Sequence, residues 1–113
     1  MRLALALVVL LVAAAPAAAA TKTVRIHDNF FLKDRLTVRA GTTIVWRWPG
    51  AEESGDVHDV KLKSGPKEVR KFHSEAASTE YSFRRKLKRP GRYRIVCTLH
   101  EEMAMMIKVR RGR

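Results

Sequence analysis

The sequence predicts an all-β domain, a sandwich or barrel of about seven or eight short strands. Three observations predict it: apolar and polar residues alternate along short segments, Gly and Pro turns separate these segments, and helical apolar stripes are almost absent. This pattern is typical of antiparallel sandwiches and barrels. The prediction applies to the chain that follows the apolar N-terminus.

Seven alternating segments are the expected strands: 23–26, 36–39, 43–48, 57–63, 80–87, 93–97 and 105–109. Their predicted inward residues are Ile44, Trp46, Trp48, Tyr81, Phe83, Leu87, Tyr93, Ile95, Cys97, Ile107 and Val109. Turn residues such as Ala40–Gly41 and Pro49–Gly50 end these strands. Residues 28–34 are expected to cross irregularly, and residues 72–78 could hold one turn of helix.

The first 20 residues have the composition of a signal peptide. Arg2 supplies a positive start, Leu3–Ala15 is apolar, and Ala17–Ala20 offers small residues at a cleavage site. We expect cleavage after Ala20, which leaves a single domain, residues 21–113, exported to the periplasm, the extracellular space or the cell envelope. The apolar run is near the lower length limit for spanning, so an uncleaved anchor is the alternative.

The positive charge limits the classes of partner. The chain has 23 Lys and Arg against 11 Asp and Glu, a formal net charge of +12. Such a charge solubilises the surface, or attracts acidic partner proteins or an anionic envelope surface. Nucleic acid is not expected, because the basic residues are spread along the chain and export removes most such targets.

One motif near the C-terminus carries most of the functional information. Cys97, His100 and Met103 form C-x-x-H-x-x-M, and Cys97 is the single cysteine, so it cannot form an internal disulfide. A thiolate, an imidazole and a thioether are soft ligands that favour copper. His58, before a separate strand, is the best candidate for the second imidazole of a His₂Cys site with a weak axial Met. Strands far apart in the sequence meet at one end of a sandwich, so the four side chains can converge there.

These segments resemble the small cupredoxins of the plastocyanin, pseudoazurin and amicyanin group. The resemblance rests on the segments Leu36–Trp46, His58–Val60, Pro90–Cys97 and Cys97–Met103, and the last has the short spacing of amicyanin. It implies a Greek-key β-sandwich for residues 21–113. It also implies one mononuclear copper ion, with His58, Cys97 and His100 as equatorial ligands and Met103 as the axial ligand.

The same resemblance implies roles for two neighbours of the ligands. Asp59 and Thr98 should tie the two ligand loops together. The family usually has Asn where this chain has Asp59, and an acid should favour the oxidised metal. Two further departures are Glu101–Glu102, where the family often has Pro and Gly, and Met105, which at the longer plastocyanin-like spacing is the alternative axial ligand.

The expected function is that of an exported blue (type 1) copper protein that carries single electrons between redox partner proteins. We expect a monomer and no enzyme, because the sequence offers neither a substrate-activating base nor an open metal position. One alternative is copper sequestration or delivery in the cell envelope, which the additional methionines favour. Another is a metal-free cationic sandwich that binds an envelope polymer. His27 and His73 are expected to be ordinary surface residues.

Overall fold

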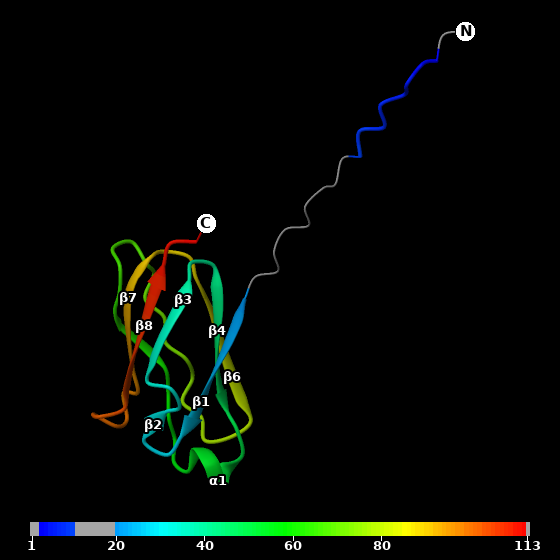
Figure 1. The fold of residues 1–113 in the computed structure, drawn as a ribbon. Helices are drawn as coiled ribbons and strands as arrows, with labels where there is room; N and C mark the ends of the chain where they lie inside the picture. Colours follow the sequence, from blue (N-terminus) through cyan, green and yellow to red (C-terminus); the bar gives the residue numbers. More distant parts are fainter. Residues whose placement is uncertain (1–2, 11–19, 113) are drawn as a thin grey trace.

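The computed structural model describes residues 3–10 and 20–112, in which eight strands form two facing four-stranded sheets (Figure 1). The strand order is β2-β1-β4-β6 in one sheet and β3-β8-β7-β5 in the other. The elements are β1 (Thr21–His27), β2 (Phe30–Phe31), β3 (Arg35–Arg39), β4 (Thr42–Trp48), α1 (Ala51–Ser54), β5 (Lys61–Ser64), β6 (Tyr81–Leu87), β7 (Gly91–Val96) and β8 (Ala104–Arg110). The predicted all-β sandwich is confirmed.

Strand pairing departs from the prediction in one respect. β4–β6, β7–β8 and β5–β7 are antiparallel, as expected, but β1 lies parallel to β4 and β3 lies parallel to β8. The reason is that the tight turn at Gly41, where φ is 95°, sends β3 and β4 into different sheets. Strands that are neighbours in the sequence are then not always neighbours in a sheet.

Two local predictions were wrong. The expected strand 57–63 is shorter, because β5 begins at Lys61 and His58 makes an isolated bridge with Ala77. The expected helical turn at 72–78 is absent from these described residues, where His73 bridges Lys61 instead. Both errors have one cause: residues 57–63 and 72–78 pair with each other only through isolated bridges, not as regular strands.

The core fills the space between the sheets. The inward residues predicted from alternation are buried, including Trp46 and Ile95 at 0% exposure, although Tyr81 is only partly buried. Trp46 lies against the rings of Phe72 and Phe83, with ring centroids 5.9 Å apart in each pair. The sandwich is therefore a rigid support for the loops at its ends.

The two ends of the sandwich differ in construction (Figure 1). The end called here the turn end holds the β3–β4 turn, the β6–β7 turn and the end of β8. The opposite end, called here the loop end, holds α1 and the loop that joins β7 to β8. β7 runs from the first to the second, so six residues at about 3.3 Å each separate them by roughly 20 Å.

Residues 3–10 lie outside the core. Residues 1–2 and 11–19 of the expected signal peptide lie outside the described residues, and Leu3–Leu10 has no regular structure and is exposed. Every strand begins at or after Thr21, and the first core residue is Val24. No helix in residues 3–10 or 20–112 is long and apolar enough to cross a membrane. A chain that begins at Thr21 therefore contains the whole core.

Candidate metal centre

Three donor atoms from two distant stretches of chain meet at the loop end. The Nδ1 atoms of His58 and His100 lie 3.1 Å apart. Cys97 Sγ lies 4.0 Å from the Nδ1 atom of His58 and 3.6 Å from that of His100. His58 and Cys97 are buried, whereas His100 is partly exposed. The structure thus brings together the three residues that the sequence singled out as equatorial ligands.

The backbone around α1 orients His58. Its Nε2 atom lies 2.6 Å from the carbonyl oxygen of Ser54, the last residue of α1. Because a carbonyl only accepts, Nε2 carries the proton and donates it, which leaves the Nδ1 lone pair for the cluster. Gly55 follows with a φ of 67°, and a Cβ there would lie 2.6 Å from the Asp28 side chain, so the turn after α1 requires glycine. Trp48 Nε1 donates to the backbone oxygen of His58 at 3.1 Å and fixes its main chain.

The loop between β7 and β8 closes on itself. Cys97 N donates to Met103 O at 2.9 Å, and Met103 N donates to His100 O at 3.0 Å. Val96 and Ala104 pair directly beneath, as the last rung of the β7–β8 ladder. Two rigid strands therefore hold both ends of a loop that carries three candidate ligands.

The arrangement of the donors fits a metal ion. The Nε2 atom of His100 faces Asp56 Oδ2 at 3.6 Å, which favours its proton on that side and leaves the Nδ1 lone pair free. The two Nδ1 atoms lie 3.1 Å apart, and they are satisfied either by a proton that one ring donates to the other or by a cation that both bind. An ion bound at about 2.0 Å to each nitrogen and about 2.3 Å to sulfur, in one plane, separates its donors by about 3.5 to 3.7 Å. The observed separations of 3.1 to 4.0 Å bracket these values.

Burial changes the acidity of the Cys97 thiol. Loss of solvent raises the pKa of the Cys97 thiol above its ordinary value, although backbone hydrogen bonding partly opposes the rise. Without a metal the sulfur is therefore a protonated thiol at neutral pH. A bound ion would displace that proton, because the thiolate is the ligand form of cysteine.

Asp59 joins the two ligand loops through a buried carboxylate. It accepts from Thr98 N at 2.6 Å and also from the Thr98 hydroxyl. The amide of Thr98 binds Oδ1, whereas the Thr98 hydroxyl binds Oδ2, and His73 Nε2 also lies 2.7 Å from Oδ2. Burial alone would raise the pKa of Asp59, but the bonds from His73 and Thr98 outweigh it and hold the pKa below its ordinary value. The carboxylate is therefore ionised beside the ligand residues.

The two remaining histidines were predicted to be ordinary surface residues. For His73 this is wrong in part: its side chain is 49% exposed, yet it binds a carboxylate whose exposure is 5%. His27 is partly buried and stacks on Phe30, with ring centroids 4.8 Å apart. No sequence motif identified the contact of His73, because it depends on the irregular pairing of His73 with Lys61.

The two candidate axial methionines occupy different environments. Met103 lies in the ligand loop and is 1% exposed. Met105 lies in β8, and its sulfur accepts a hydrogen bond from Trp46 Nε1 at 3.4 Å inside the core. The sulfur of Met105 is thus engaged in packing between the sheets, which favours Met103 as the residue available to the cluster.

Comparison with known proteins identifies the fold. No family model matches the sequence, and no curated protein matches it. Amicyanin from Paracoccus versutus (Thiobacillus versutus) has 25% identity and a TM-score of 0.66, with 85% of each chain covered. A Cu(I) form of an amicyanin variant has 20% identity and a TM-score of 0.68, covering 80% of this chain and 83% of that one.

A copper-containing nitrite reductase from Thermus scotoductus is also similar, with 21% identity and a TM-score of 0.65 over 80% of this chain, but the match covers only 22% of the reductase. The likeness is therefore to a part of that larger protein. The chain is a β-sandwich of the cupredoxin fold, and its cluster of His58, Cys97 and His100 fits a blue copper site.

Proposed function

We propose that this chain is an exported blue copper protein that carries single electrons between redox partners. The observation that carries the proposal is the convergence of two imidazole nitrogens and one thiol sulfur within 4.8 Å of one another. A His₂Cys set with a weak axial thioether is characteristic of electron-transfer copper sites. The similar amicyanin structures, which include oxidised and reduced Cu(I) forms, support copper as the ion.

We assign the equatorial positions to His58, Cys97 and His100 and the axial position to Met103. The axial assignment is supported by the packing of Met105 against Trp46, which occupies the competing sulfur. Copper, when bound, supplies a one-electron couple between Cu(II) and Cu(I). The protein contributes ligands whose orientations are fixed before binding, by the Ser54 carbonyl for His58 and by the closed loop for the others.

The exposed edge of the site is at His100. Its side chain is 23% exposed, whereas that of His58 is fully buried, so an electron enters or leaves most directly through the His100 ring. Leu99 and Val57 are exposed to 52% and 40% near the two ligand loops and offer apolar contact to a partner. This arrangement supports transfer to a docked protein rather than chemistry on a bound substrate.

Copper delivery remains the competing function, but no observation in the described residues favours it. The methionines that suggested Cu(I) handling are not exposed: Met103 and Met105 are buried and Met106 is partly buried. A delivery site would benefit from thioethers that a partner can reach. The electron-carrier proposal therefore has the stronger support.

The test is a copper titration of the chain beginning at Thr21, followed by visible absorption and voltammetry. One equivalent of Cu(II) should give an intense thiolate-to-copper band and a reversible one-electron wave. Cys97→Ser should abolish the band, while the control His27→Gln, which changes a histidine outside the cluster, should retain it. Absence of the band in the unmodified chain would overturn the proposal, as would a band that survives Cys97→Ser.

A further inference from the structure

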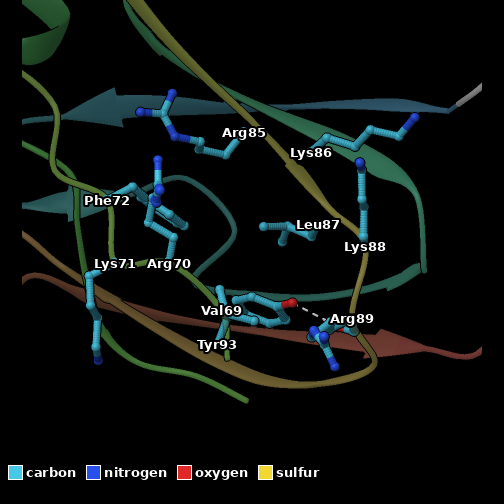
Figure 2. Close-up of a pocket in the computed structure, with 10 residues that line it drawn as sticks. All are labelled: Val69, Arg70, Lys71, Phe72, Arg85, Lys86, Leu87, Lys88, Arg89 and Tyr93. Carbon is cyan, nitrogen blue, oxygen red and sulfur yellow. Dashed lines mark hydrogen bonds between the residues drawn. The ribbon is translucent and has the colours of Figure 1, made fainter. Parts of the chain in front are cut away.

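A cleft of about 320 Å³ lies at the turn end, away from the metal cluster (Figure 2). Its apolar lining comes from Val69, Phe72, Leu87 and Tyr93, and Figure 2 shows the Leu87 side chain and the Tyr93 ring near its centre. The remaining lining is basic: Arg70, Lys71, Arg85, Lys86, Lys88 and Arg89. The volume is within the range of ligand sites. An apolar lining within a cationic rim suits a ligand that is anionic at one part and apolar at another.

The basic side chains of the cleft are only weakly neutralised. Arg89 pairs with Glu68 at 2.9 Å, and both side chains are more than half exposed, so the pair is worth little. The guanidinium of Arg85 lies 4.3 Å from the centre of the Phe83 ring, which holds it in place without cancelling its charge. Within the described residues, the rim makes no other ion pair with an acid. The cleft therefore keeps most of its positive potential.

In the described residues the acids are concentrated toward one end of the sandwich, whereas basic residues lie at both ends, with Lys33 and Lys61 among those near the acids. The turn end also carries Arg39, Arg110 and Arg111, beside the cleft residues. Most of the acids gather at the loop end: Asp28, Asp34, Glu52, Glu53, Asp56, Glu80, Glu101 and Glu102. A molecule with this polarity is oriented by an anionic surface, with its turn end toward that surface.

The path of the chain favours a membrane as that surface. Thr21 pairs with Thr43, and Thr43 pairs with Lys86 of the cleft. The chain that precedes Thr21 therefore leaves the sandwich next to the cleft. That preceding chain is the apolar segment that the sequence predicts to engage a membrane during export. The end of the domain next to that segment is thus the end where acids offset the positive charge least.

We propose that the turn end binds the anionic headgroups of a phospholipid membrane, with one phosphate-bearing headgroup in the cleft. Arginine guanidinium groups bind phosphate with paired hydrogen bonds, and lysines near the bilayer add to the attraction. The apolar lining contacts the glycerol and upper acyl carbons of the same lipid. The loop end then faces the aqueous phase about 20 Å away, where His100 can meet a soluble partner.

Vesicle sedimentation tests this contact with the chain beginning at Thr21, which removes the apolar segment as a cause of binding. Vesicles of phosphatidylcholine alone are compared with vesicles that are one-third phosphatidylglycerol. The protein should bind only the second, and binding should weaken as salt rises. Lys86→Glu with Lys88→Glu should weaken binding by about 30-fold or more, because each basic residue near the surface contributes about fivefold. The control, Lys33→Glu with Lys61→Glu near the loop end, changes net charge equally and should weaken it by less than about threefold.

Two results would overturn the proposal: no sedimentation with the anionic vesicles at low salt, or equal losses in the two double variants. The first result, together with binding of an acidic protein, would assign the turn end to a protein partner instead. Arg110→Glu with Arg111→Glu, at the same end but outside the cleft, provides a second test if the first variant does not fold. The copper band is recorded on each sample, so a failure of membrane binding with the band intact leaves the copper proposal unaffected.

Discussion

Replacing Asp59 with Asn should raise the reduction potential of the bound copper. The Asp59 side chain is 5% exposed, and its carboxylate accepts from Thr98 N at 2.6 Å. That nitrogen is four covalent bonds from Cys97 Sγ, so the negative charge lies within roughly 7 Å of an ion bound to the sulfur. A negative charge so close stabilises Cu(II) more than Cu(I). Its removal should therefore favour the reduced form.

The size of the change follows from Coulomb's law. At about 7 Å the interaction is about 2.4 kcal/mol for an effective dielectric constant of about 20, and about 0.6 kcal/mol for the value of water. A one-electron potential shifts by about 59 mV for each tenfold change in the equilibrium constant. The expected increase is therefore about 25 to 100 mV.

The assay is voltammetry of the copper protein, with the unmodified chain and Asp59→Asn measured in the same buffer. Asn can still accept the hydrogen bond from Thr98 N, and the visible band should confirm an intact site. The control Glu52→Gln removes an equal charge from exposed α1, where solvent screens it, and should shift the potential by less than about 10 mV. An unchanged or lower potential for Asp59→Asn, with the band intact, would refute the reasoning.

Three further predictions concern the ligand loop and its supports. Met105→Ala should keep the visible band but lower the free energy of unfolding by about 2 to 5 kcal/mol in urea titrations, because it leaves a cavity beside Trp46. Met103→Ala should alter the band, and the opposite pattern would assign the axial role to Met105. His73→Gln should retain the band and lower the free energy of unfolding by about 1 kcal/mol, since it removes a partner of a buried carboxylate; an unchanged urea midpoint would contradict this. Because burial raises the pKa of the Cys97 thiol, the apparent Kd for copper should rise at least about tenfold for each unit by which pH falls below that pKa; a pH-independent Kd in competition titrations would contradict this.

The strands were predictable where one face of a strand meets the opposite sheet. Trp46 and Ile95 are fully buried because alternation along β4 and β7 matches the pleat of the sandwich. The same rule failed for residues 57–63. The sequence alternates there, but His58, Asp59 and Val60 are all buried, and the segment pairs regularly only from Lys61. A period of two predicts burial only where the backbone is paired as a regular strand.

The grouping of His58, Cys97 and His100 could be predicted because ligand chemistry limits the residue types, and a sandwich brings distant loops to one end. The contacts that orient these ligands could not be predicted from the sequence. The contact of His73 with Asp59 depends on an irregular pairing of backbone segments, and the Ser54 carbonyl that orients His58 belongs to a helix of four residues. Backbone carbonyls carry no sequence signature, so such contacts appear only once the fold is known.

Net charge alone also misdirects the choice of redox partner. A charge of +12 suggests acidic partners, but an acidic protein would be drawn to the turn end, roughly 20 Å from the copper ligands. A partner that approaches His100 meets Glu101, Glu102 and Asp56 instead. We therefore expect a small cationic oxidant to react faster than an anionic oxidant of similar potential at low salt, with the difference shrinking as salt rises. Stopped-flow rates for both reagents would test this, and a faster anionic oxidant would show that the total charge, not its distribution, controls the encounter.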